Sequence, residues 1–136
     1  MTDVSAPPQS LSIAEVSDAT GLSIDTLRWY ERQQLFPPVT RDSGRRRRYS
    51  VEDMSRIRLM LRLRRTGMPV KDIRRFVELL AGGPETHRER LALLQSHRSR
   101  ILSDMDQLAK DLDAVDFKIG HYTELVGDGL DCQYPA

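Results

Sequence analysis

The strongest constraint on the fold is an apolar repeat that fills the last third of the chain. Between residues 84 and 126, apolar side chains recur at alternating spacings of three and four: Leu91, Leu94, Ile101, Met105, Leu108, Leu112, Val115, Ile119, Tyr122 and Val126. The repeat runs for about five heptads, more than the three or four that indicate a coiled coil. Such a helix is on the order of 60 Å long, too long to fold back on the small domain before it. We therefore predict that it pairs with a second copy of the chain in a twofold homodimer.

Arg98 fills the one slot of this repeat that lacks an apolar residue. At a helix seam its side chain is buried unless it pairs or lies off the contact, and the sequence does not choose between these. The sequence as a whole predicts a disordered lead (1–10), a small helical domain (11–82), a dimerisation helix (83–126) and a short tail (127–136).

Two short helices joined by a tight turn are predicted near the start. Ser12 and Glu15 have the spacing of a capping box, and Gly21 ends the first helix. Ser23 caps a second helix over about 24–34. Helices of this length around a glycine-containing turn are typical of a helix-turn-helix.

The segment FPPVTRDSGRRRRYS (36–50) predicts a small hairpin, or wing. Two prolines forbid helix there, and Asp42, Ser43 and Gly44 supply a turn. Val39 and Thr40 are expected to pair with 47–49. Two further helices follow, one from the Ser50 cap to Gly67 and one over 69–80, with Pro69 as its first residue. The predicted fold class is mainly α, a winged helix-turn-helix followed by a long helix.

Charge is distributed unevenly along the chain. Residues 1–80 hold 15 basic and 10 acidic side chains, and residues 81–136 hold 6 and 10. A basic front half indicates an anionic partner for that half alone. Only three of the 21 basic residues are lysine. An arginine bias fits bidentate contacts to phosphate and guanine, although a GC-rich genome produces the same bias.

The wing and the second helix carry the candidate DNA contacts. In the wing these are Arg41, Arg45, Arg46, Arg47, Arg48 and Tyr49, and in the helix Thr26, Arg28, Trp29 and Tyr30. The arginines suit a phosphate backbone, and Arg28 suits a guanine edge. The alternatives are a solvated loop tip for the wing, and a core position for Trp29 or Tyr30. Glu31 repels DNA, and we expect it to pair with Arg28 or Arg32.

Other chemistries find little support. The chain has no GxSxG, no phosphate-binding glycine loop and no nucleophile beside a base, so we predict no enzyme. His87, His97, His121 and Cys132 lack metal-ligand spacing, so we predict no metal and no cofactor. No apolar run is long enough to span a membrane, no secretory signal is visible, and a single cysteine favours a cytoplasmic setting.

The order of elements resembles the MerR family of bacterial transcription regulators. The motifs that carry the resemblance are SIAEVSDATGLSIDTLRWYERQQLFPP, GRRRRY, SVEDMSRIRLM and RRTGMPVKDIRRFVELL, and they cover about residues 11–126. The resemblance implies an antiparallel coiled-coil dimer on a pseudo-palindromic promoter whose DNA it distorts, so that RNA polymerase is affected only indirectly. It places the recognition helix on 23–33, which adds Ser23 to the DNA-binding residues.

Three departures from the family stand out. Gln34 occupies a position where the family commonly has glycine, so a positive φ there carries strain. The cysteines of the family's metal sensors are absent, and we expect no effector domain after Val126. We therefore predict a sequence-specific DNA-binding regulator. A plain repressor, a DNA-architecture protein and a coiled-coil adaptor are the alternatives, and the inducing signal is unspecified.

Overall fold

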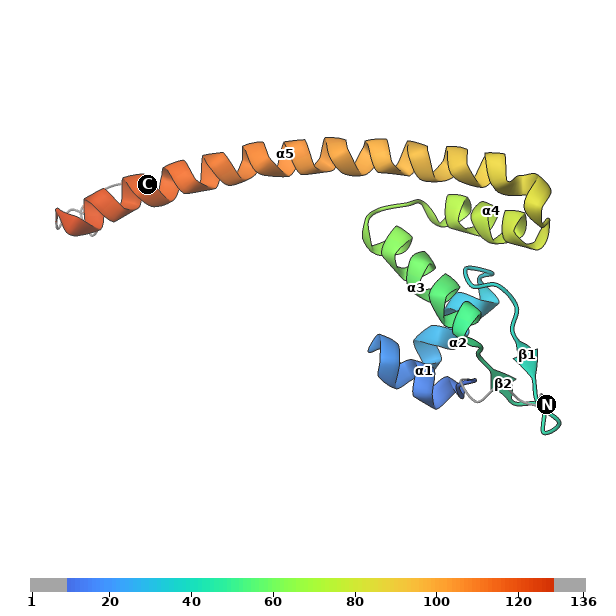
Figure 1. Ribbon diagram of the computed structural model, residues 1–136. Helices are drawn as coiled ribbons and strands as arrows, with labels where there is room; N and C mark the ends of the chain where they lie inside the picture. Colours follow the sequence, from blue (N-terminus) through green and yellow to red (C-terminus); the bar gives the residue numbers. More distant parts are fainter. Residues whose placement is uncertain (1–9, 129–136) are drawn as a thin grey trace. The chain divides into compact units, whose positions relative to one another are not determined.

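The computed structural model describes residues 10–128, which divide into two compact units on either side of the bond between Gln95 and Ser96. The predictions for residues 1–9 and 129–136, including Cys132, lie outside the described residues. The elements, in chain order, are α1 (Ile13–Thr20), α2 (Ile24–Arg32), β1 (Thr40–Arg41), β2 (Arg47–Arg48), α3 (Val51–Arg65), α4 (Val70–Ala81), a single turn of 3-10 helix (Pro84–Thr86) and α5 (His87–Gly127) (Figure 1). The mainly helical fold class and the wing are confirmed.

The predicted starts of α1 and α3 are confirmed at the level of single hydrogen bonds. The Ser12 hydroxyl accepts from the Glu15 N–H at 3.2 Å, and the Glu15 carboxylate accepts from the Ser12 N–H at 2.9 Å. Ser50 and Asp53 form the same reciprocal pair at the start of α3. These caps satisfy N–H groups that have no partner inside the helix.

Several predicted boundaries shift. Helix α2 ends at Arg32, because Gln33 caps it and Gln34 turns the chain with φ +60°. Pro69 is the cap before α4 and has extended ψ (145°), so it is not the first helical residue. Helix α5 begins at His87, because the residues from Pro84 form the 3-10 turn.

The paired segments of the hairpin also differ from the expected ones. Thr40 pairs with Arg48 and Arg41 with Arg47, while Val39 lies outside the strand. Tyr49 instead forms a bridge to Leu11, with hydrogen bonds of 2.7 and 2.8 Å. The wing is thereby attached to the chain that enters α1.

One hydrophobic core holds the first unit together. Its buried members come from α1 to α4 and the connections between them: Val16, Leu27, Leu35, Phe36, Tyr49, Met54, Ile57, Met60, Leu63, Met68, Ile73, Phe76 and Val77. Leu93 and Leu94, in the first two turns of α5, pack against this core. The expectation that the long helix does not fold back is therefore wrong for its first turns, because the core offers them an apolar surface.

Hydrogen bonds fix the connection between α4 and the start of α5. Gly83 has φ +77°, a conformation that favours glycine. The Thr86 hydroxyl donates to the Leu79 carbonyl at 2.6 Å, and the Arg90 guanidinium donates to the Gly83 carbonyl at 2.9 Å. The turn is a defined junction between two helices.

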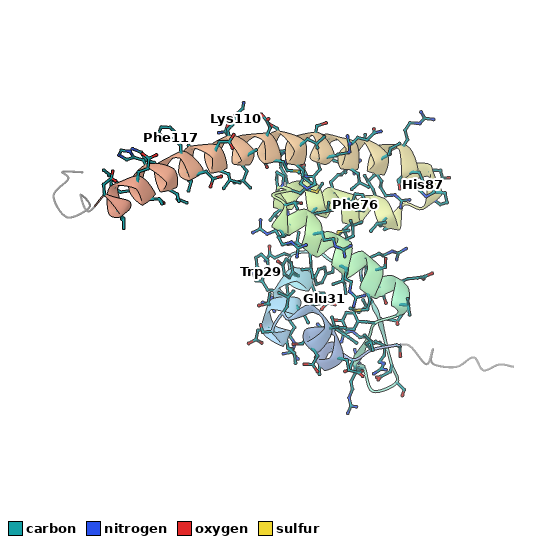
Figure 2. The ribbon with its side chains drawn as sticks, turned by 60° about the vertical axis from the view of Figure 1, so that its left-hand side comes forward. Trp29, Glu31, Phe76, His87, Lys110 and Phe117 are labelled. Carbon is teal, nitrogen blue, oxygen red and sulfur yellow. The ribbon has the colours of Figure 1, made fainter. Side chains whose placement is uncertain are left out.

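The second unit is the remainder of α5, a continuous helix to Gly127. His97 is buried, and Arg98 is exposed. The side chains around Lys110 and Phe117 radiate from the helix on all sides (Figure 2). Seven of the predicted dimerisation residues are between 52% and 69% exposed: Leu91, Met105, Leu108, Leu112, Val115, Ile119 and Tyr122. Leu91 lies in the first unit, and the other six lie in the second.

Candidate nucleic-acid interface

Helix α2 presents two of its predicted contact residues to solvent. Arg28 and Trp29 are exposed, whereas Leu27, the residue before them, is buried in the core. Ser23 caps the helix, and its hydroxyl accepts from the Thr26 N–H at 3.0 Å. Thr26 is half-buried. The capped N-terminal turns of a recognition helix are the part that reaches base edges.

The two adjacent aromatic residues of α2 have different surroundings. Tyr30 is half-buried and stacks on Phe36, with ring centroids 5.0 Å apart. Trp29 is 40% exposed and meets Tyr30 edge-to-face at 5.4 Å. Figure 2 labels Trp29 on the same helix as Glu31. Tyr30 therefore extends the core, and Trp29 is the aromatic side chain available at the surface.

The tip of the wing is built around Asp42. Its carboxylate accepts from the backbone N–H groups of Arg46 at 3.0 Å and Gly44 at 2.9 Å. These hydrogen bonds, the one from Arg46 first, hold the pKa of Asp42 below its ordinary value. Arg45 has φ +64°, and its carbonyl accepts from the Arg41 guanidinium at 3.0 Å. Arg41, Arg45 and Arg46 are all exposed.

The rest of the arginine run has protein partners. Arg47 pairs with Glu31 of α2 at 2.5 Å. Arg48 donates to the hydroxyl and the carbonyl of Ser10, both at 2.9 Å. The expectation that Glu31 pairs with Arg28 or Arg32 is wrong, because the hairpin brings Arg47 to the side of α2. A pairing between residues so far apart in sequence leaves no local signal.

Tyr49 is 4% exposed and belongs to the core. Burial raises the pKa of its phenol, and the Glu31 carboxylate adds to this effect. The side chain of Tyr49 therefore has almost no accessible surface for the predicted phosphate contact.

One cleft brings the predicted basic residues of the wing and of α2 together. It has a volume of about 330 Å³ and is lined by Ser12, Ile13, Arg28, Arg41, Asp42, Arg45, Arg46, Arg47 and Arg48. Six guanidinium groups face one carboxylate here, so the cleft is strongly positive. Trp29, Tyr30 and Tyr49 do not line it.

A hydrogen bond that links α4 to the end of α2 was not predicted from the sequence. The Arg74 guanidinium of α4 donates to the Gln33 carbonyl, at the end of α2, at 3.0 Å. This bond satisfies a carbonyl that the helix end leaves free and fixes the end of α2 against α4. Within residues 10–128, no group of three or more His, Cys, Asp or Glu side chains is placed to hold a metal ion.

Over the described part of the chain, no helix combines the length and the apolar character needed to cross a bilayer.

Comparison with known proteins identifies the family. Residues 11–80 match the MerR HTH family of regulatory proteins, and residues 54–115 match the MerR DNA-binding family. The chain belongs to the MerR family. An uncharacterised HTH-type transcriptional regulator of Haemophilus influenzae is 34% identical over 80% of this chain and 81% of its own length. The mercuric resistance operon regulatory protein of Serratia marcescens is 31% identical over 76% and 68%.

Solved structures of MerR regulators share the fold. HiNmlR, a MerR family regulator lacking the sensor domain and bound to promoter DNA, matches with a TM-score of 0.84 and 30% identity, over 92% of this chain and 99% of that one. A MerR family regulator from Listeria monocytogenes matches with 0.81 and 32%, over 90% and 94%. The predicted family and the predicted DNA-binding role in transcription regulation are confirmed.

Proposed function

We propose that this MerR-family chain is a homodimeric regulator that grips a pseudo-palindromic promoter site and distorts the DNA to control transcription. The observation that carries the proposal is the basic cleft, where Arg28 of α2 and five wing arginines surround one carboxylate. We propose no enzymatic activity and a cytoplasmic location, where the promoter lies. RNA polymerase is then affected only through the shape of the DNA.

The residues divide by role. We assign base reading to Arg28, with Trp29 and Thr26 beside it, and phosphate contacts to Ser23, Arg41, Arg45 and Arg46. Arg47 and Arg48 are assigned first to holding the wing, because Glu31 and Ser10 already engage them. Tyr30 and Tyr49 are assigned to packing.

The long helix supplies the dimer. Its exposed apolar residues require a partner surface that shields them from water. A groove of about 710 Å³ runs along Val115, Ile119, Tyr122 and Val126. An antiparallel copy of the same helix presents the same stripe and covers it. The dimer then places two DNA-binding units at one separation, as a twofold site requires. Leu94 is assigned to the core of its own chain, and Ile101 is half-buried.

Distortion has a defined energetic cost. Bending a site of 20–30 base pairs costs about 1–6 kcal/mol in smooth elastic estimates. The contacts of two wings and two recognition helices must offset this cost. Because this cost depends on the sequence that is bent, the base pairs between the half-sites affect the affinity even where the protein does not touch them.

The test is the salt dependence of binding to the duplex upstream of the protein's own gene. A binder with 6–10 phosphate contacts loses about 10³–10⁵ in affinity between 50 and 200 mM salt. The double variant Arg45→Ala/Arg46→Ala should flatten the log–log salt slope by about one for each phosphate that the variant no longer neutralises, on every sequence. Arg28→Ala should instead weaken binding to the specific site by about 1–3 kcal/mol.

The matched control is Arg100→Ala, which removes an exposed arginine of α5. It should leave the slope unchanged. An unchanged slope for the wing variant, or DNA binding insensitive to salt, contradicts the assignment and favours the adaptor. A bound site over the transcription start without DNA bending selects the plain repressor.

A further inference from the structure

A second cavity in the first unit lies outside the basic cleft. It has a volume of about 480 Å³, is open to solvent on one side, and is bordered by the end of α2, the segment leading into β1, and the last turns of α4. It is lined by Glu31, Gln34, Phe36, Pro38, Val39, Arg41, Val77, Glu78 and Ala81. Its volume lies within the range of about 300–1,000 Å³ typical of small-molecule sites. Of this set, only Arg41 is assigned a DNA contact, and only Glu31 pairs with an arginine of the basic cleft.

The cavity combines an apolar wall with an excess of carboxylate. Phe36 and Val77 are buried members of the core that also reach the cavity, and Val39 is half-buried beside them. The charged residues of the lining are Glu31, Glu78 and Arg41. Arg41 already donates to the Arg45 carbonyl and also lines the basic cleft. Two carboxylates and one guanidinium give the lining a formal charge of −1, and Glu31 is itself paired with Arg47.

Glu78 is the less engaged of the two carboxylates. Its contact is the Arg75 guanidinium at 3.6 Å, and the same guanidinium lies 2.9 Å from Glu89. Both side chains of the Arg75–Glu78 pair are more than half exposed, so the pair is weak. The Glu78 carboxylate has capacity for a closer cationic partner.

Gln34 supplies an independent indication. Its φ of +60° is a left-handed conformation that is strained for a residue other than glycine. Outliers of this kind gather at ligand sites. A glycine there would relieve the strain and remove the only side-chain amide from the cavity wall.

We propose that this cavity binds a small organic cation, a protonated amine with an aryl or alkyl body. The apolar body lies against Phe36, Val39 and Val77, and the ammonium group lies near Glu78 and Glu31 with the Gln34 amide beside it. Burial of the body supplies most of the affinity, and the carboxylates select the charge.

Ligand binding in this cavity is coupled to the wing through Glu31. Glu31 lines the cavity and also holds Arg47 of β2. An ammonium group at Glu31 competes with Arg47 for the carboxylate, so occupancy loosens the attachment of the wing to α2. This step rests on the proposed DNA-binding function, while ligand binding itself does not.

Ligand binding is tested on the full chain without DNA. The probe is phenylbutylamine, and phenylvalerate is the matched anion of the same length and body. Isothermal titration should give saturable binding of the amine to one site per chain, and NMR shift changes should centre on Val39, Val77 and Ala81. The anion should bind at least about tenfold more weakly, which corresponds to 1.4 kcal/mol.

Three variants locate the site. Glu78→Gln should weaken amine binding about twofold to fivefold, the range for an exposed ion pair, and Glu85→Gln, an exposed carboxylate outside the cavity, should not. Gln34→Gly should weaken binding while the fold becomes more stable, which distinguishes a direct effect on the ligand from unfolding. Equal or tighter binding of phenylvalerate, no saturable amine binding below about 10 mM, or unchanged affinity in both Glu78→Gln and Gln34→Gly overturns the proposal.

The coupling to DNA is measured separately. Saturating phenylbutylamine should weaken binding of the wild-type chain to the duplex and have a smaller effect on Glu31→Gln, where Arg47 no longer has its carboxylate partner. Tight DNA binding with no amine binding overturns the ligand site alone. Amine binding in a chain that does not bind DNA contradicts the proposed function and leaves the site standing.

Discussion

Residues 10–95 and residues 96–128 differ in where their apolar side chains lie. In the first unit, short helices and a two-stranded wing enclose a core whose members, such as Ile57 and Ile73, are almost fully buried. In the second unit, a single helix leaves residues such as Leu108 and Leu112 more than half exposed. The first unit therefore carries its own hydrophobic stabilisation, whereas the second requires a partner surface. We therefore expect folding of the first unit and assembly through the second to be separable in this chain.

The largest expected effect comes from placing a charge in the exposed stripe. In Leu112→Asp, burial of the leucine is lost in both copies of a twofold dimer, at about 1.5–3 kcal/mol for each copy. The dimer should weaken by about two to four orders of magnitude. Analytical ultracentrifugation measures this, with Ser103→Asp on the same helix as the control. A dimer that survives Leu112→Asp unchanged would show that the exposed stripe is not the dimer contact.

The next effect belongs to the enclosed core. Ile73→Ala should reduce the free energy of unfolding by about 2–5 kcal/mol, because it leaves a cavity in a packed interior. Chemical denaturation at several protein concentrations distinguishes this loss from that of Leu112→Asp. The stability lost by Ile73→Ala should not depend on concentration, whereas that lost by Leu112→Asp should. The same concentration dependence for both would show that the units do not differ in this way.

A smaller effect, of opposite sign, is expected at the turn after α2. Gln34→Gly should raise the free energy of unfolding by about 0.5–1 kcal/mol, since the relief of left-handed strain exceeds the added flexibility of the unfolded chain. Gln33→Gly is the control, because φ is −82° there and glycine has no strain to relieve. Thermal denaturation compares the two. Equal destabilisation by both glycines would refute the strain.

The smallest expected effect on the free energy of unfolding near neutral pH comes from Tyr49. Its pKa is raised in the folded state by burial and by Glu31. The neutral phenol is therefore favoured by folding, so this stability is fully present below the ordinary pKa near 10.0 and is lost as pH rises through the raised value. Ultraviolet titration should show one late tyrosine step that Tyr49→Phe abolishes. A step retained in Tyr49→Phe would assign it to another tyrosine.

The sequence predicted what depends on neighbouring residues. The caps at Ser12, Ser23 and Ser50 follow from side chains three residues from their partners. The strained φ at Gln34 follows only from the family resemblance, in which glycine is common at this position. The wing and the helix-turn-helix follow from turn chemistry and apolar spacing. The two family matches confirm the resemblance on which the DNA-binding prediction depended.

What the sequence missed depends on pairings between distant segments. The Glu31–Arg47 and Arg74–Gln33 interactions join residues 16 and 41 positions apart. No periodic pattern encodes such pairs. The four arginines 45–48 look equivalent in sequence, yet the hairpin exposes the first two and engages the last two. Leu94 continues the heptad spacing but packs on the core of its own chain.

The stoichiometry of the DNA complex tests whether a shared helix pair holds two DNA-binding units together. Sedimentation of the chain with the duplex upstream of its gene, at low salt, should give two chains on one duplex, and Leu112→Asp should abolish that species. A complex of one chain with one duplex at equal affinity would contradict the account of two DNA-binding units held together by a shared helix pair.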